Sequence, residues 1–425
     1  MTLFDVAAVL VALAAAAGYL NHRMLKLPPT SGTLLVAIAG SILGVLADLS
    51  VPSLGLRAGI SAFVANIDFN EALMRGMLSF LLFAGALNVN VSELLAHKWI
   101  IGLLATLSVV LSTVVVGVLT RDALSFVGID VPLVETLLFG AVISPTDPIA
   151  VLALLKRVGA PSDLATQIAG ESLFNDGVGV VLFLGLLATV GARLDPHAMI
   201  AGAGDGLAWF FLREVVGGAL FGATVALGVC RALERVDDAS LELLMTIAMV
   251  MGTYSLSFVL HVSGPIAIVV AGLVIGDLGR RVAMDARTRE HVDAFWAMID
   301  ELLNIVLFLL LGLQVMTVKA SVMEFVAATV AVPIVLFARL TSVGAAVAIL
   351  SVRTRRVRGF VPILTWGGLR GGLSVAMVLS LPPFPERGLF LACTYAVVVF
   401  SILVQGLSMR RLLTRYGLVD RPASG

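Results

Sequence analysis

The feature that most constrains this chain is a series of long apolar runs that recurs from one end to the other. Runs of about 20 residues with few charges are long enough to cross the hydrocarbon core of a bilayer as helices. Of the 425 residues, 59% are hydrophobic and 13% are charged, and a water-soluble fold could not bury that share of apolar surface. The runs lack the alternation of apolar and polar residues found in outer-membrane barrel strands. The sequence therefore predicts an all-α polytopic membrane protein.

Thirteen such runs can be counted, and each is expected to be a transmembrane helix. They are residues 4–20, 30–47, 73–91, 99–120, 133–155, 164–190, 208–230, 241–260, 264–278, 300–316, 323–350, 360–381 and 389–409. With alternating crossings, nineteen of the 28 basic residues fall in loops on one side and seven on the other. Cytoplasmic loops carry the excess of Lys and Arg, so the N-terminus is expected outside and the C-terminus in the cytoplasm. Arg23 and Lys26 follow the first run, which favours a retained helix over a cleaved signal peptide.

Two of the runs carry residues that break helices. The fifth contains ISPTDPIAV (143–151), where Pro145 and Pro148 each remove a backbone donor. The twelfth contains TWGGLRGGLSV (365–375), with four glycines around Arg370. Unwound backbone at membrane depth is tolerated only where it is buried in protein or lines a cavity. Both segments are therefore expected to be broken helices.

The order of the two broken segments predicts an internal repeat. They are seven segments apart, so they should cross the membrane in opposite directions. Two six-helix inverted repeats, at residues 1–190 and 241–415, would then be joined by a linker helix at 191–240 within a single transport unit covering residues 1–425. Broken helices in corresponding positions of inverted repeats are typical of the binding site of a secondary transporter. No cytoplasmic regulatory domain is expected, since little sequence follows the last run.

Five charged residues lie inside the apolar runs rather than at their ends: Asp147, Glu171, Asp176, Arg339 and Arg370. A charge at a helix centre costs about 2.5–3.5 kcal/mol on insertion scales, so such residues are functional candidates. The alternative is that they form ion pairs that only hold helices together.

The sixth segment has one polar face within AGESLFNDGVGVV (169–181). At about 100° per residue, Glu171, Ser172, Asn175 and Asp176 fall within an arc of about 140°. The Asp176 carboxylate, the hydroxyls of Ser172 and Thr146, and free carbonyls of the broken fifth segment are oxygen ligands that suit a hard monovalent cation. A carboxylate in such a pocket holds either a proton or a metal cation but not both, and this competition would couple two opposed fluxes.

The remaining charges are expected to support this site. Glu171 should pair with Arg339, the arginine at mid-depth in the eleventh segment. Asp147 should offset the positive N-terminal ends of half-helices, and Arg370 the negative C-terminal ends or the free carbonyls at the same crossing.

The strings GAVISPTDPIAVL, AGESLFNDGVGVV, GPIAIVVAGLVIGD (264–277) and LTWGGLRGGLSVAMVLSLP resemble the monovalent cation:proton antiporter family, in its branch of NhaP-type and sodium/proton exchangers. The resemblance implies thirteen helices in two inverted repeats, a homodimer, an elevator-like movement of a core domain and no cofactor besides the transported Na⁺ and H⁺.

By motif position, the resemblance makes Asp176 the acid that binds proton and cation, Ser172 and Thr146 its co-ligands, and Glu171 the partner of Arg339. Asn175 stands where an electrogenic sister branch has a second aspartate, which implies electroneutral exchange of one cation for one proton. One departure is Ala84 in LLFAGALNVN (81–90), where relatives often carry a carboxylate. The choice among Na⁺, Li⁺ and K⁺ therefore stays open.

The leading hypothesis is a Na⁺/H⁺ antiporter in the inner cell membrane that serves pH homeostasis, with a K⁺/H⁺ antiporter of the same fold as the alternative. An intramembrane aspartyl protease, for which His261 lies near Ser263, and a channel are remote alternatives; the protein is not expected to be an enzyme. The zero net charge gives no support for nucleic-acid binding. The expected partners are monovalent cations, protons, the lipid bilayer and a second copy of the chain.

Overall fold

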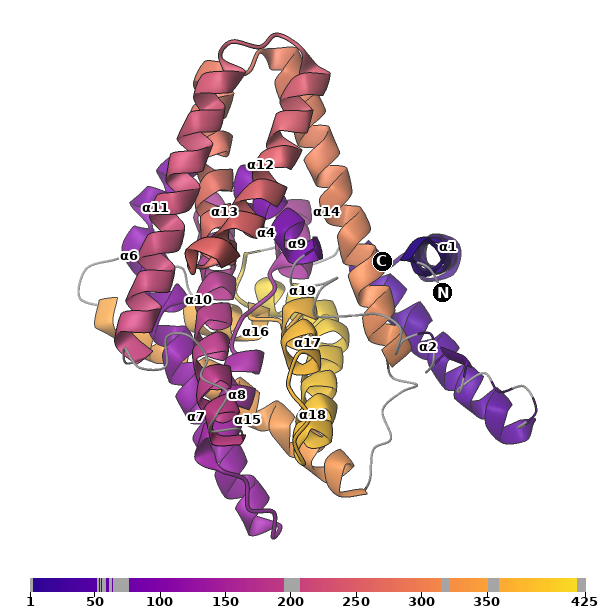
Figure 1. Cartoon of the computed structure of the whole chain (residues 1–425). Coiled ribbons are helices and arrows are strands. Elements are labelled where there is room, and N and C mark those ends of the chain that lie inside the picture. Colours follow the sequence, from indigo (N-terminus) through magenta and orange to yellow (C-terminus); the bar gives the residue numbers. More distant parts are fainter. Residues whose placement is uncertain are drawn as a thin grey trace.

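The computed structural model describes residues 3–51, 53, 55, 59–60, 63, 76–194, 207–314, 322–350 and 359–418, and every long element among them is a helix (Figure 1). The elements are α1 (Leu3–Leu20), η1 (Asn21–Leu25), α2 (Pro29–Ser50), α4 (Leu78–Leu87), α5 (Val91–Ala96), α6 (Lys98–Ala105), α7 (Leu107–Phe126), α8 (Leu133–Ile143), α9 (Ile149–Val158), α10 (Ser162–Leu194), α11 (Leu207–Leu233), α12 (Ala239–Leu260), α13 (Gly264–Val274), η4 (Ile275–Ala283), α14 (Ala286–Gln314), α15 (Val322–Leu350), α16 (Phe360–Gly367), α17 (Gly372–Leu379), α18 (Arg387–Phe400), η5 (Ser401–Gly406) and α19 (Leu407–Arg415).

Each of the thirteen predicted segments contains a helix or a helix pair. Among the described residues, nine helices are long and apolar enough to cross a bilayer, or ten if the bent pair α16–α17 is one span. Two shorter apolar helices, α4 and α8, fall in the third and fifth predicted segments. The all-α membrane fold is thus confirmed, while the count of thirteen crossings and the inverted repeats stay predictions. Residues 195–206 of the expected linker lie outside the described residues.

The expected breaks in the fifth and twelfth segments are present. The fifth segment is α8 followed by α9, with residues 144–148 non-helical between them. The twelfth is α16 followed by α17, and these two helices are bent by 47° at residues 368–371.

One predicted boundary is wrong, and the error matters for the site. The tenth segment was expected to begin at residue 300, but α14 begins at Ala286. Hydropathy marks only the apolar part of a helix, whereas α14 starts in a charged stretch where the Asp285 carboxylate accepts a hydrogen bond from the Thr288 N–H at 2.7 Å. That bond lowers the pKa of Asp285 and satisfies one of the free donors at the helix start.

The helices pack as two groups, each of which draws on both halves of the chain. The first bundle contains α6, α7, α8, α10, α15, α16, α17 and α18. The second bundle contains α1, α2, α4, α11, α12, α13 and α14. In Figure 1, α7, α15 and α18 lie in the lower half of the view, and α11, α12 and α13 in the upper half. Contacts of α10 with α11 and α13, and of α14 with α17, join the two bundles.

Candidate ion-binding site

The two broken segments meet each other directly. The backbone N–H of Asp147 donates to the carbonyl of Leu369 at 2.8 Å, which joins the non-helical residues 144–148 to residues 368–371. We refer to these two stretches together as the crossing. Prolines on one side and glycines on the other explain why neither stretch continues as a helix.

Arg370 satisfies the carbonyls that the first break leaves free. In a continuous helix the carbonyl of Ser144 would accept from residue 148, but Pro148 has no N–H. The Arg370 Nη1 instead donates to Ser144 O at 2.6 Å and to Pro145 O at 2.9 Å. Arg370 is 1% exposed, so these bonds compensate part of the cost of burying its charge. This is the position at free carbonyls that the sequence predicts for it.

Asp147 caps the half-helix that follows it. Its Oδ1 accepts from the Ile149 N–H at 3.0 Å, at the start of α9, where a negative charge is favoured by the helix dipole. The carboxylate lies directly against Gly371, because a Cβ added there would be 2.1 Å from Asp147 Oδ2. Any residue other than glycine at this position would displace the carboxylate.

The polar face of α10 binds the crossing through Thr146. The Thr146 and Ser172 hydroxyl oxygens are 3.1 Å apart. Asn175 holds the same threonine twice, because its Nδ2 donates to Thr146 Oγ1 at 2.7 Å and its Oδ1 accepts from the Thr146 N–H at 3.4 Å. The asparagine is completely buried. Gly179 allows this approach, since a Cβ there would lie 2.3 Å from Pro145 Cγ.

Glu171 and Arg339 form the buried ion pair that was expected from their positions. Glu171 Oε1 and Arg339 Nη1 are 2.5 Å apart, and the two side chains are 2% and 5% exposed. Arg339 Nη2 also donates to Leu364 O at 3.3 Å. Gly368 leaves the space for the guanidinium, because a Cβ there would be 2.5 Å from Arg339 Nε.

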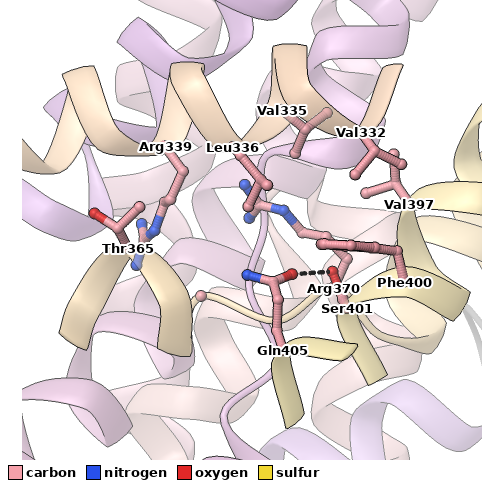
Figure 2. Close-up of a pocket in the computed structure, with 11 residues that line it drawn as sticks. Val332, Val335, Leu336, Arg339, Thr365, Arg370, Val397, Phe400, Ser401 and Gln405 are labelled. Carbon is pink, nitrogen blue, oxygen red and sulfur yellow. Dashed lines mark hydrogen bonds between the residues drawn. The ribbon is translucent and has the colours of Figure 1, made fainter. Parts of the chain in front are cut away.

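A small cavity of about 10 Å³ lies beside the two arginines (Figure 2). Arg339 reaches it from α15, and Arg370 reaches it from the crossing. Gln405 lines the same cavity and accepts a hydrogen bond from Ser401 Oγ at 2.8 Å. It also donates to the carbonyl of Trp366 at 3.1 Å. The two arginines therefore share a small cavity that is also lined by residues of α18 and η5.

A much larger cavity, of about 590 Å³, lies between the two bundles and is lined by the crossing, α4, α9, α10, α14 and α17. Asp176, Ser172, Thr146 and Asp147 all line it, and Asp176 is partly exposed there. The structure thus brings together every residue that the sequence nominated for ion binding, with Asp176 lining the cavity.

The α4 wall of the cavity carries no carboxylate in its described residues. Ala84 lines the cavity, as does Asn88. The Asn88 Oδ1 accepts from Arg280 at 3.1 Å and its Nδ2 donates to Ala84 O at 3.2 Å. Asn88 is therefore engaged in bonds with the protein and is a poor replacement for a missing acid.

Sequence reasoning missed Asp300 and Asn304, which line the cavity from α14. Hydropathy makes Asp300 the first residue of the segment 300–316, and so predicts a helix end at the interface. Because α14 begins at Ala286, Asp300 lies in the middle of the helix. The i, i+4 spacing of an acid and an amide on one helix face was the signal that could have identified them.

A polytopic helical protein whose two broken spans cross beside a cavity lined by carboxylates has the architecture of a secondary transporter. Residues 9–415 match the family described as sodium/hydrogen exchanger, transmembrane. The chain belongs to the sodium/hydrogen exchanger family and is a multi-pass membrane protein.

Two relatives illustrate the sequence similarity. The chain is 44% identical over 422 residues to the Na(+)/H(+) antiporter NhaP of Pseudomonas aeruginosa, which covers 97% of each protein. It is 31% identical over 403 residues to the Na(+)/H(+) antiporter NhaH of Halobacillus dabanensis, covering 91% of this chain and 97% of the relative.

The fold is similar to a solved structure, that of the sodium proton antiporter MjNhaP1 from Methanocaldococcus jannaschii. The match has a TM-score of 0.75 at 17% sequence identity and covers 99% of this chain and all of the other. At that identity the similarity concerns the fold.

Proposed function

We propose that this protein is a secondary antiporter that exchanges Na⁺ for H⁺, with both ions competing for Asp176. The observation that carries the proposal is the position of Asp176, which lines the large cavity beside the hydroxyls of Ser172 and Thr146. The relatives with high coverage are named Na(+)/H(+) antiporters, which favours Na⁺ over K⁺ as the cation.

The oxygen atoms around Asp176 suit a hard monovalent cation. Each hydroxyl has two lone pairs, so Thr146 Oγ1 can accept from Asn175 and still offer a lone pair to a cation. The crossing and α10 approach closely enough for Ser172 and Thr146 to present their oxygens together. We therefore assign Na⁺ to Asp176, Ser172 and Thr146.

The balance of the five charged residues in the crossing, α10 and α15 supports one-for-one, electroneutral exchange. Asp147, Glu171 and Asp176 carry three negative charges when ionised, and Arg339 and Arg370 carry two positive charges. One proton or one Na⁺ neutralises the remaining charge of these five residues, so the proton-loaded and Na⁺-loaded states carry the same charge whatever the charge of Asp300. The neutral Asn175, bonded to Thr146, adds no second titrating acid.

We assign the other charged residues to support. Glu171 and Arg339 remain paired through the cycle, since separating a buried pair leaves uncompensated charge. Arg370 and Asp147 hold the crossing through their bonds to Ser144 O and the Ile149 N–H.

Movement of the first bundle against the second would expose Asp176 to each side in turn. The Asp176-lined cavity lies between these bundles, which favours such a movement over a continuous pore.

The proposal is tested in proteoliposomes loaded with a pH-sensitive dye, with Na⁺, Li⁺ and K⁺ added in turn. The parent should move protons when Na⁺ is added, and Asp176→Asn should not. Parent-like exchange by Asp176→Asn would refute the mechanism. A response to K⁺ alone would favour the K⁺/H⁺ alternative, and a turnover far above the carrier range would favour a channel.

We also propose a homodimer in the inner cell membrane, with the N-terminus outside and the C-terminus in the cytoplasm, and a role in pH homeostasis. The distribution of basic residues in the loops supports this orientation, and the bacterial relatives support the compartment. Light scattering on detergent-solubilised protein tests the dimer. Labelling of single cysteines placed at the two termini with an impermeant reagent tests the orientation.

A further inference from the structure

The wall of the large cavity formed by α14 carries an acid that the mechanism above does not use. Asp300 lines the cavity together with Asp176 and Asp147. Asn304, one turn further along α14, donates from Nδ2 to Asp300 Oδ1 at 3.1 Å and to Asp300 O at 2.8 Å. These bonds hold the carboxylate on the cavity wall.

Two further oxygens at this wall have no hydrogen-bond partner within the described part of the chain. They are Asn304 Oδ1 and Ser374 Oγ. Asn304 is 2% exposed and Ser374 is 1% exposed, and both line the cavity. Buried polar atoms in proteins nearly always have a partner, so two unpartnered oxygens on residues that line one cavity point to a ligand between or beside them.

The two elements that carry these oxygens are in close contact. Helix α14 packs against α17, and a Cβ added at Gly372 would be 2.1 Å from Leu307 Cδ2. Leu307 is three residues after Asn304, and Gly372 is two residues before Ser374. The absence of a side chain at Gly372 therefore lets the α14 wall approach the start of α17 at the level of Asn304 and Ser374.

We propose that Asp300, Asn304 and Ser374 form a second cation-holding position in the cavity, separate from Asp176. A carboxylate, an amide oxygen and a hydroxyl are hard ligands for a monovalent cation, and the amide nitrogen of Asn304 is already bonded to Asp300. Asp300 and Asn304 belong to the second bundle, whereas Ser374 and Asp176 belong to the first. The position is therefore assembled only when the bundles are arranged as they are here.

This position rests on the proposed antiport and adds a capture step to it. A carboxylate in the cavity raises the local concentration of cations beside Asp176. Asp300 does not take part in the steps that follow once a proton or a cation is bound at Asp176. Loss of Asp300 should therefore change the apparent KM for Na⁺ far more than the maximal rate.

The first test measures binding without transport. Melting temperature is followed in detergent with NaCl against choline chloride, in Asp176→Asn and in the double variant Asp176→Asn/Asp300→Asn. A ligand that binds only the folded state raises its stability. We expect the single variant to retain a Na⁺-dependent rise and the double variant to lose it. An equal rise in both variants, or no rise in Asp176→Asn, would overturn the proposal.

The second test measures transport in the proteoliposome assay. Asp300→Asn should raise the apparent KM for Na⁺ about tenfold with a maximal rate near that of the parent, and Asp300→Glu should restore it. Glu301→Gln is the matched control, because Glu301 is the adjacent acid but is exposed and is not a lining residue of the cavity. A KM for Asp300→Asn equal to that of the control overturns the inference.

Two further outcomes of these tests can be told apart: a variant that does not fold, and failure of the proposed function itself. If Asp300→Asn does not fold, Asn304→Ala and Ser374→Ala replace it, and parent-like KM values in both overturn the proposal. If the parent itself shows no Na⁺-driven proton flux, the proposed function fails, and the binding test still decides whether the second position exists.

Discussion

The Glu171–Arg339 pair offers the sharpest test of how the site is built. Neutralising either partner, as in Glu171→Gln or Arg339→Gln, leaves the other charge buried at 2–5% exposure. Removing one partner of a buried pair typically costs about 3–5 kcal/mol, whereas replacing both at once costs much less. Arg339 would keep its bond to Leu364 O at 3.3 Å, so Glu171→Gln should be the milder single substitution.

The assay is a double-mutant cycle on the purified protein, with the free energy of unfolding measured in detergent. The double variant Glu171→Gln/Arg339→Gln should cost less than the more damaging single variant, so it should fall short of the sum of the singles by about 3 kcal/mol or more. If Glu171 is a support residue, Glu171→Gln protein that remains folded should still show competition between Na⁺ and H⁺. Additive losses, or single variants as stable as the parent, would refute the assignment of a structural pair. If Glu171→Gln instead lost the competition between Na⁺ and H⁺ while its free energy of unfolding stayed unchanged, Glu171 would have to be assigned to ion binding.

Three other predictions follow from the same contacts. Gly371→Ala should abolish exchange, because its Cβ would lie 2.1 Å from Asp147 Oδ2; Gly252→Ala, with open space around the added Cβ, is the control, and equal activity of the two would contradict the geometry. Asn175→Asp should make exchange sensitive to an imposed membrane voltage, because it adds an acid and removes the donor to Thr146; a rate that does not respond to valinomycin-imposed potentials would count against the charge balance. The apparent KM for Na⁺ should rise as pH falls, by about tenfold per unit in the acidic limit, because Asp176 must lose its proton to bind a cation; a KM constant between about pH 6 and about pH 9 would rule out competition.

Much of the architecture follows from the sequence alone, because it depends on local rules. Apolar runs long enough to span a bilayer predict membrane helices wherever they occur; each predicted segment contains a helix, and nine or ten of the described helices are long and apolar enough to cross. Pro145 and Pro148 break the fifth segment regardless of its neighbours, since neither can donate a backbone hydrogen bond. The helical period places Ser172, Asn175 and Asp176 on one face before any tertiary contact is known.

The contacts that give these residues their roles come from tertiary packing. Arg370 reaches the Ser144 carbonyl across 226 positions, and Asn175 reaches Thr146 across 29, distances at which neither periodicity nor hydropathy carries information. The sequence suggested that Asn175 affects the charge balance of exchange. Only the fold shows that its amide also hydrogen-bonds Thr146 and so joins the broken segment to α10. Asp300 was overlooked for a related reason: hydropathy ends where charged residues begin, while α14 continues through them. The sequence by itself determined that the Asp176 carboxylate lies within a membrane helix. The packing of the two bundles decided that Asp176 lines a cavity, and which other oxygen-bearing side chains line the same cavity.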